Sequence, residues 1–209
     1  MFITFEGIDG SGKSTQAQLL HSSLTDRGYS VRRVREPGGT DLGESIRKLL
    51  LDPESVLTPR AELLLFSASR AQLVESVIEP ALSRGDIVIA DRFYDSSTAY
   101  QGVGRALAGL DWIDGFHQFV TGGRAPDRTY LLSLGPSSAA RRRDGREHTD
   151  RMEASGKAFF DRVADAYAEL AKREPRRITV VDAEETPDRI AESILGNVLT
   201  ALERRSRGR

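Results

Sequence analysis

An eight-residue segment near the start of the chain constrains the fold more than any other feature. Residues 7–14 read GIDGSGKS and match the pattern G-x-x-x-x-G-K-S/T. An apolar, strand-like run (Phe2–Phe5) precedes it and a helical pattern (Ser14–Arg27) follows it. Glycines let such a loop bring its backbone N–H groups close to phosphate oxygens, and the helix N-terminus adds a positive end. The alternative is a glycine-rich turn without a ligand, and the flanking strand and helix argue against it.

The residue types within this segment indicate how it would bind ATP and a metal ion. Lys13 can place a cation on the β- and γ-phosphates of ATP, and the Ser14 hydroxyl can ligate Mg²⁺, the expected cofactor. We predict that ATP is bound by Gly7, Ile8, Asp9, Gly10, Ser11, Gly12, Lys13, Ser14 and Thr15.

Strand-like and helix-like patterns alternate along the 209 residues. Alternation of this kind predicts parallel strands joined by helical crossovers, that is, an α/β fold in a single domain spanning residues 1–209. Pro80 is expected to kink or shorten the third helix. The predicted strands are 2–5, 29–35, 87–90, 129–134 and 178–181, and the predicted helices are 14–27, a short one around 42–50, 58–84, 110–120, 136–143, 153–172 and 187–204.

Composition excludes several classes of function. The formal net charge is −1, so no overall field attracts nucleic acid or an anionic membrane. The chain has no cysteine, and its three histidines are scattered without zinc spacing. No stretch approaches the roughly 18 apolar residues of a membrane span, and the first residues are too short for a signal peptide and lack a basic start. We expect a soluble cytoplasmic protein without nucleic-acid or membrane partners.

A second acidic motif follows the third predicted strand. Asp91 and Arg92 stand at the end of the apolar run Ile87–Ala90. Ligands of open α/β sheets lie beyond the carboxyl ends of the strands, so Asp91 is expected near Mg²⁺ and Arg92 near a phosphate. A surface Asp-Arg pair after a core strand is the alternative, which the phosphate-binding loop makes the weaker one.

Residues 141–151 read RRRDGREHTDR, with five arginines and no apolar side chain. Arginines that close over the transferred phosphoryl group accelerate phosphoryl transfer, and a polar segment containing a glycine suits a lid. A solvated helix end would also explain the composition. The sequence alone does not decide which arginine would contact the transferred group.

Candidate acceptor residues gather in three places. Phe66 and Arg70 are four apart on one predicted helix face, which suits an aromatic ring stacked on a base beside a donor to its edge. Taken alone, each has an ordinary role in a core or on a surface. Residues 95–102 are rich in hydrogen-bonding groups, and Arg35 ends the second strand.

Two absences narrow the class of enzyme. There is no N/T-K-x-D, so a guanine-reading GTPase is disfavoured, and no L-S-G-G-Q, which disfavours a transporter ATPase. A small kinase is favoured. Two alternatives stay open: a kinase for another acceptor, and a non-enzymatic protein whose nucleotide state switches partner binding.

Seven segments together resemble the thymidylate kinases nearly from end to end: FEGIDGSGKSTQ, REPGGT, FSASRAQ, DRFYDSSTAYQG, APDRTYLL, DRME and VVDA. The resemblance implies a P-loop NTPase fold with five parallel strands in the order 2-3-1-4-5, flanked by helices and with a short lid at about 141–151. It implies transfer of the γ-phosphoryl of Mg·ATP to dTMP, giving dTDP for dTTP biosynthesis, and a homodimer. The bond before Pro37 is expected to be cis in some members.

The resemblance also implies roles for individual residues. Phe66 would stack on thymine, Arg70 would bond its edge, and Tyr100 would lie beside C2′ of the sugar. Gly10 stands where some members have an arginine, so the catalytic arginine is expected in the lid. The implied dTMP-binding set is Asp9, Arg35, Phe66, Arg70, Arg92, Ser97, Tyr100 and Gln101; the catalytic set is Lys13, Arg92, Asp9 and lid candidates Arg142, Arg143 and Arg146; the metal set is Ser14 and Asp91. The chain departs from the family at Leu132-Ser133 and Gly135-Pro136, so no acid is assigned a role there.

Overall fold

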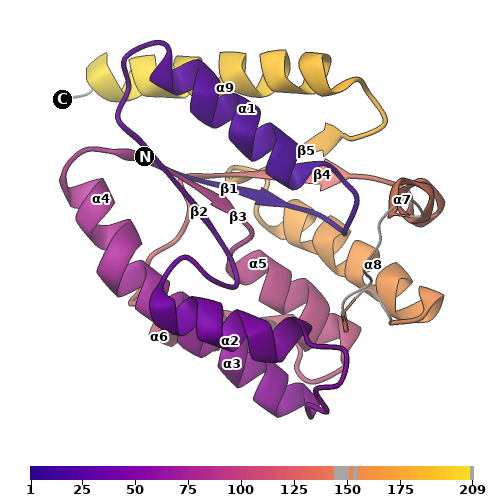
Figure 1. Cartoon of the computed structure of the whole chain (residues 1–209). Coiled ribbons are helices and arrows are strands. Elements are labelled where there is room, and N and C mark those ends of the chain that lie inside the picture. Colours follow the sequence, from indigo (N-terminus) through magenta and orange to yellow (C-terminus); the bar gives the residue numbers. More distant parts are fainter. Residues whose placement is uncertain (144–150, 153–154, 208–209) are drawn as a thin grey trace.

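A five-stranded, all-parallel sheet forms the centre of the molecule (Figure 1). This computed structural model describes residues 1–143, 151–152 and 155–207. The strands are β1 (Phe2–Glu6), β2 (Val31–Arg35), β3 (Ile87–Asp91), β4 (Arg128–Ser133) and β5 (Ile178–Asp182). Their order across the sheet is β2-β3-β1-β4-β5, so the predicted topology is confirmed. The residues of β1 and the first four of β3 are buried, as expected for strands covered on both faces.

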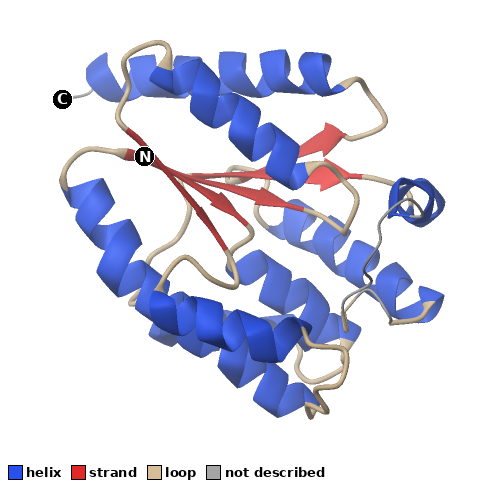
Figure 2. Cartoon of the chain, viewed as in Figure 1, coloured by secondary structure: helices blue, strands red, loops and turns tan. Residues whose placement is uncertain are grey.

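Helices cover both faces of this sheet (Figure 2). One face carries α1 (Lys13–Thr25) and α9 (Pro187–Arg207), which lie side by side. The other elements are α2 (Asp41–Leu51), α3 (Pro59–Leu73), η1 (Val74–Ile78), α4 (Glu79–Ser83), α5 (Tyr94–Ser97), η2 (Thr98–Gly104), α6 (Leu110–Val120), α7 (Pro136–Arg143) and α8 (Lys157–Arg173). None of the helices described here is both long and apolar enough to cross a membrane.

Local sequence explains how several helices begin and end. Thr58 caps α3 by accepting a hydrogen bond from the Ala61 N–H, and Pro59 occupies the first turn, as predicted. Gly28 has a φ of 84° after α1, a conformation that favours glycine. Pro80 does not end the third helix: the chain widens into the π-helical turn η1 just before it and continues as α4. A π turn shifts the hydrogen-bonding pattern where proline supplies no N–H.

One helical stretch was not predicted. Residues 94–104 form α5 and η2, which run on from each other directly after β3. Two glycines permit close packing here: a Cβ on Gly104 would lie 2.8 Å from Phe159, and one on Gly102 would lie 2.9 Å from Ile113. The segment therefore packs tightly against α6 and α8 and carries its polar side chains to the carboxyl ends of the strands.

Strand register brings the chemistry-bearing ends together. Within the sheet Arg35 pairs with Asp91, and Phe5 pairs with Asp91 from the other side. The carboxyl ends of β1, β2 and β3 therefore meet at one edge, where the loop 7–12 follows β1 and Arg92 follows β3. The peptide bond between Glu36 and Pro37 is cis, as the resemblance implied.

Candidate active site

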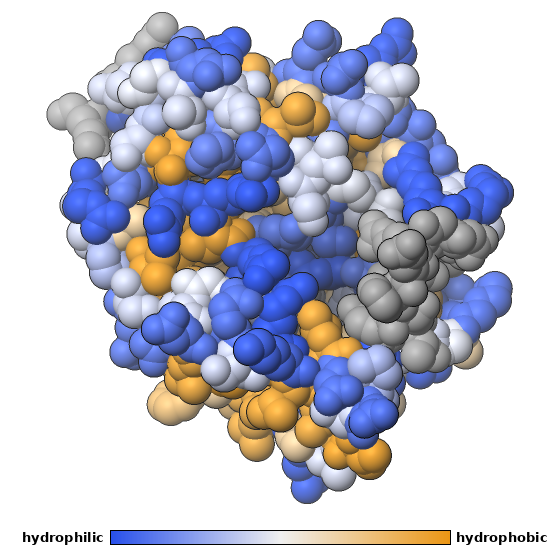
Figure 3. All heavy atoms as spheres, viewed as in Figure 1, coloured by the Kyte–Doolittle hydropathy of each residue, from blue (hydrophilic) through white to orange (hydrophobic). Residues whose placement is uncertain are grey.

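A cavity of about 340 Å³ opens at this edge of the sheet. Figure 3 shows it as a hollow with hydrophilic side chains near the centre of the face seen in Figure 1. It is lined by Asp9, Gly10, Gly12, Lys13, Ser14, Thr15, Arg35, Glu36, Pro37, Arg47, Leu51, Phe66, Asp91, Arg92, Ser96, Ser97, Tyr100, Gln101 and Met152. The predicted phosphate-binding loop and the predicted acceptor residues therefore share one cavity.

The loop between β1 and α1 provides the phosphate side of the cavity. Helix α1 begins at Lys13 without a side-chain cap and with no acid in its first turn, so its N-terminal N–H groups are available to an anion. Gly7 has a φ of 134°, and a Cβ there would lie 2.5 Å from the carbonyl oxygen of Leu132. A side chain at this position would push the loop away from β4.

Lys13 is held back along this loop. Its Nζ donates to the carbonyl oxygen of Ile8 at 2.8 Å, and the side chain is buried. Burial and the nearby Arg92 lower the pKa of Lys13 to about 8, although Asp9 and Asp91 oppose the shift. Phosphate oxygens arriving at the loop would stabilise the charged form.

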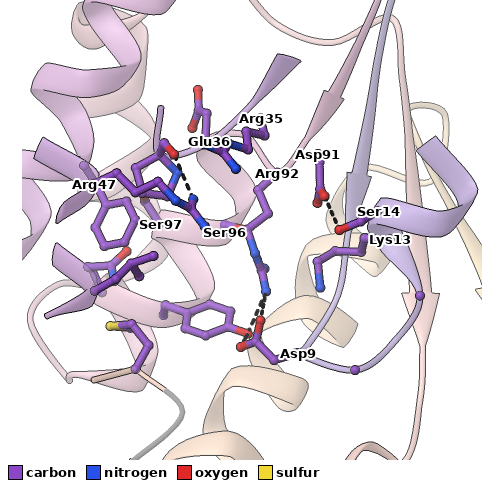
Figure 4. A pocket seen from close by; sticks show the side chains of 18 of the residues that line it. Asp9, Lys13, Ser14, Arg35, Glu36, Arg47, Asp91, Arg92, Ser96 and Ser97 are labelled. Atoms are coloured by element: carbon purple, nitrogen blue, oxygen red, sulfur yellow. Dashed lines mark hydrogen bonds and ion pairs between the residues drawn. The ribbon is translucent and has the colours of Figure 1, made fainter. Parts of the chain in front are cut away.

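Asp91 and Ser14 form the candidate metal position. The Ser14 hydroxyl donates to Asp91 Oδ2 at 2.5 Å across the mouth of the loop (Figure 4). Among the described residues, no group of three or more His, Cys, Asp or Glu side chains could hold a metal ion. One hydroxyl and one carboxylate suit Mg²⁺, which takes oxygen ligands and fills its remaining positions with water and phosphate. The residues present therefore fit the implied ion.

Arg92 connects the two halves of the cavity. It has a φ of 71°, unusual for a residue other than glycine, and this conformation turns its side chain back over the loop. Nη2 donates to Asp9 Oδ1 at 2.6 Å, and Nη1 donates to the carbonyl oxygen of Gly7 at 3.0 Å. Tyr100 donates its hydroxyl to Asp9 Oδ2 at 2.9 Å. Figure 4 shows the side chains of Arg92 and Asp9 pointing towards one another within the cavity.

Asp9 is ionised in this setting. Burial would raise the pKa of its carboxyl, but Arg92 and Lys13 together with the hydrogen bonds hold that pKa below its ordinary value. Arg92 and Asp9 thus form a preorganised ion pair at a point that faces both the loop and the acceptor side.

A buried acid lies beneath Arg92. Glu6, the last residue of β1, accepts hydrogen bonds from the Phe93 N–H at 2.7 Å, from Ser96 Oγ at 2.6 Å and from Tyr167 Oη at 2.8 Å. Burial, reinforced by Asp95, raises the pKa of Glu6 to about 7. These contacts fix the start of the helical stretch 94–104 against the end of β1.

Arg70 lies behind the acceptor side rather than on its surface. The residue is 1% exposed; its Nε donates to Glu36 Oε2 at 2.7 Å, and its Nη2 donates to Ser97 Oγ at 3.0 Å. Two atoms of this ion pair, Arg70 Nη1 and Glu36 Oε1, are buried without a hydrogen-bond partner among the described residues. Burial raises the pKa of Glu36, against the opposing charge of Arg70.

The comparisons with known proteins agree with this geometry. A sequence model of the family described as thymidylate kinase matches residues 5–194. The chain belongs to the thymidylate kinase family. This confirms the family assignment made from sequence, and with it a nucleoside monophosphate kinase of the ATP:dTMP phosphotransferase type.

Individual thymidylate kinases match this chain over almost its full length. It is 46% identical to the thymidylate kinase of an Exiguobacterium species, covering 97% of this chain and 96% of that one. It is 45% identical to the thymidylate kinase of Kosmotoga olearia, covering 100% of both. The crystal structure of thymidylate kinase from Ehrlichia chaffeensis matches with a TM-score of 0.76 at 35% identity, covering 95% of this chain and 98% of that one.

Most of the predicted site residues of this thymidylate kinase family member line this cavity. Gly7, Ile8, Ser11 and Arg70 do not line it, and neither does the lid candidate Arg142. Gly7 and Ile8 face the opposite side of the loop, towards Leu131–Leu134, because the loop wraps with only part of its length on the phosphate side. Ser11 is buried, and Arg70 is enclosed behind Glu36 and Ser97. Backbone N–H groups and a buried donor can still serve a ligand, so these roles stay predictions.

The lid candidates are only partly described. Arg142 is exposed, its Nη2 donates to the carbonyl oxygen of Ala183 at 2.8 Å, and it does not line the cavity. Arg143 ends α7, and its side chain, like Arg146 as a whole, lies outside the described residues. The expected catalytic arginine therefore stays a prediction.

Sequence reasoning missed several residues that build the site. Glu6 and Glu36 are buried acids at the end of β1 and directly after β2, and Ser96 is a buried hydroxyl on α5. An acid at the end of a predicted strand is the signal that could have found Glu6 and Glu36. Arg47 lines the cavity and donates from Nη1 to the carbonyl oxygen of Pro37 at 2.9 Å. Its place next to the buried Ile46 on α2 was the available signal.

Proposed function

We propose that this chain binds ATP on the loop 7–15 and dTMP in the adjoining part of the same cavity, and transfers the γ-phosphoryl group between them to give ADP and dTDP. The observation that carries the proposal is the shared cavity. It is lined by the loop cation Lys13, the ion pair of Arg92 with Asp9 and the aromatic ring of Phe66. The product would enter dTTP biosynthesis.

The acceptor needs no strong general base, because a phosphate oxygen of dTMP is already anionic. That oxygen forms a bond to the γ-phosphorus of ATP while the bond from this phosphorus to the bridging oxygen of ADP breaks. Lys13 binds the β- and γ-phosphates, and Arg92, held by Asp9, binds the dTMP phosphate with Arg35. Rate enhancement comes from positioning and charge neutralisation.

Mg²⁺ bound by Ser14 and Asp91 would neutralise charge on the ATP phosphates. Arg35 is paired with Glu44 at 2.8 Å and is half exposed, so it can exchange that partner for a phosphate. On the acceptor side Phe66 stacks on the base, Ser97 and Gln101 face its edge, and Tyr100 lies beside the sugar. Arg70, enclosed behind Ser97, would bond the base edge from its buried position. One of Arg142, Arg143 and Arg146 supplies the catalytic arginine from a lid at about 141–151 in a single domain.

We also propose a homodimer packed through helices, acting in the cytoplasm without nucleic-acid or membrane partners. Large apolar side chains are exposed on α2 (Leu42 and Leu49), α3 (Leu64) and α6 (Trp112 and Phe119). Apolar side chains gather at the lower end of the face in Figure 3, over α2 and α3. Phe119→Arg, at a side chain 84% exposed, is expected to yield monomers in size-exclusion chromatography with light scattering. An unchanged mass would reject this surface.

A panel of acceptors tests the reaction. The enzyme is incubated with Mg·ATP and one of dTMP, dUMP, dCMP, dGMP or thymidine, and the products are separated by chromatography. We expect dTMP to be converted to dTDP with a kcat/KM at least about tenfold higher than that for any other acceptor. Differences in binding within one pocket can produce a preference of this size. Preference for another acceptor, or slow ATP hydrolysis that no acceptor stimulates, would reject the proposal.

A further inference from the structure

A buried carboxylate supports the far wall of the cavity. Glu62 lies on α3, one turn before Phe66, so the two side chains share a helix face. Glu62 is 1% exposed and does not line the cavity itself. An acid buried to this degree is stable only with partners that satisfy its oxygens and offset its charge.

Two arginines supply that charge. Arg105 donates from Nε to Glu62 Oε1 at 3.3 Å and from Nη2 to Oε2 at 3.4 Å. Arg151 Nη2 lies 2.7 Å from Oε2. Both guanidinium groups are held from other sides as well: Arg105 lies over the ring of Phe159 at 4.6 Å, and Arg151 Nε donates to the carbonyl oxygen of Leu50 at 3.1 Å. The carboxylate of Glu62 is therefore held in a fixed position.

The third partner of Glu62 is a residue of the cavity wall. Gln101 Nε2 donates to Glu62 Oε1 at 2.9 Å, and Gln101 also lines the cavity. A carboxylate only accepts hydrogen bonds, so the amide must turn its NH₂ end to Glu62. The other end of the planar amide, Oε1, points elsewhere and makes no hydrogen bond to a described residue. The wall thus offers a hydrogen-bond acceptor to whatever fills the cavity.

We propose that Glu62 is a positioning residue that fixes the orientation of the Gln101 amide, so that the acceptor pocket selects a pyrimidine with an N3–H donor over one whose N3 is an acceptor. This inference rests on the proposed function, in which a nucleoside monophosphate occupies this cavity. Thymine and uracil carry N3–H and meet the Gln101 oxygen as a donor. Cytosine presents a lone pair at N3, and two acceptors facing each other in a buried site repel.

The single variant Glu62→Gln provides the first test. In Glu62→Gln the new amide carbonyl is expected to face the arginines, so its NH₂ end turns to Gln101 and reverses that amide. We expect the KM for dTMP to rise about tenfold and the ratio of kcat/KM for dUMP over dCMP to fall about tenfold or more, in line with one reversed hydrogen bond. KM for ATP should stay within about twofold, since the loop is untouched.

The double variant Glu62→Gln/Gln101→Glu separates amide orientation from packing. The carboxylate introduced at position 101 would accept a hydrogen bond from the amide introduced at position 62 with one oxygen and keep its other oxygen as an acceptor towards the base. We expect the double variant to recover the wild-type dUMP-over-dCMP ratio to within about threefold, whereas Gln101→Glu alone, with two adjoining carboxylates, stays impaired. Glu79→Gln, an acid-to-amide change in the ion pair with Arg124 remote from the cavity, is the matched control and should change neither ratio nor KM.

Several results would overturn the inference. It fails if Glu62→Gln leaves both the dTMP KM and the dUMP-over-dCMP ratio within about twofold of wild type, or if the double variant is no better than either single variant. If Glu62→Gln alone does not fold, the double variant decides: a dUMP-over-dCMP ratio within about threefold of wild type supports the inference, and any lower ratio overturns it. A wild-type enzyme that phosphorylates none of the three nucleotides overturns the proposed function, and this inference with it.

Discussion

The two sides of the cavity are built in opposite ways. The phosphate side comes mainly from one continuous segment, the loop and the first residues of α1, to which β3 adds Asp91, and it relies on backbone groups and a single lysine. The acceptor side is assembled from α3, the segment after β2 and the helical stretch 94–104. Its hydrogen bonds join residues that lie up to 39 positions apart in the sequence. One side is local in sequence and the other exists only in the folded chain.

Burial differs in the same direction for the metal position and the base-binding wall, although Lys13 itself is buried. Ser14 is exposed and Asp91 only half-buried, whereas the acceptor side rests on buried ion pairs such as Arg70 with Glu36, whose side chains are 1% and 2% exposed. Triphosphate recognition can use groups that solvent also reaches, because charged side chains and backbone N–H groups bind the phosphate oxygens. Discriminating one base from another requires groups fixed before the ligand arrives, and buried, fully paired side chains are fixed.

The largest effect is expected on the phosphate side. Lys13→Ala removes the loop cation, so kcat should fall by about 10³-fold or more, while dTMP affinity changes by less than about twofold. Turnover is measured by ADP release and dTMP affinity by calorimetry. Lys48→Ala, at an exposed position on α2, is the matched control. Normal turnover of Lys13→Ala would contradict the assigned reaction, and an equal loss of dTMP affinity would erase the distinction between the two sides.

The acceptor side should respond through KM and stability together. Arg70→Ala leaves the buried Glu36 without its cation, so the KM for dTMP should rise about 100-fold and the free energy of unfolding should fall by about 3–5 kcal/mol. KM for ATP should change by less than about twofold. Steady-state kinetics with each substrate varied, and denaturant unfolding, measure the two quantities. Equal increases in both KM values would show that Arg70 does not belong to the acceptor side alone.

This difference in construction also explains what the sequence could predict. The loop and the five strands were accessible because apolar runs and one motif carry them locally, whereas the order of the strands came from the family resemblance. The helical stretch 94–104 was missed because its packing depends on Gly102 and Gly104 meeting Ile113 and Phe159, which no local pattern reveals.

The same limit applies to the buried acids. Nothing in the sequence around Glu62 shows that it is buried, since its partners lie 39 to 89 positions further along the chain. A lone Glu on an amphipathic helix ordinarily lies in solvent. Phe66 was singled out by its spacing to Arg70 and Gln101 by the hydrogen-bonding run 95–102, and both lie in segments that carry the family resemblance. Glu62 lies outside all of these segments.

Glu6, which lies beneath Arg92 between the two sides of the cavity, should make the stability of the protein depend on pH. The pKa of Glu6 is raised by burial from 4.5 to about 7. The folded state therefore binds this proton more tightly than the unfolded state, so stability falls as pH rises from about 4.5 to about 7 and levels off above. Glu6→Gln removes the titrating group. Urea unfolding of both proteins at pH 5, 6, 7 and 8 should show a difference in stability that changes with pH; parallel curves would reject this role.

The smallest effect is expected where the two sides meet solvent. Arg47 is only half-buried, donates to the carbonyl oxygen of Pro37 and adds positive charge to a cavity that already holds Arg35 and Arg92. Because water screens it and its neighbours share its charge, Arg47→Gln should weaken dTMP binding only about three- to tenfold, or about 1 kcal/mol, with kcat nearly unchanged. Calorimetry with dTMP and with thymidine gives the sharper test: a charge acting on the phosphate weakens dTMP alone, and Arg33→Gln on the exposed side of β2 should weaken neither. An equal loss for thymidine would place Arg47 with the base-binding wall, where position rather than charge decides affinity.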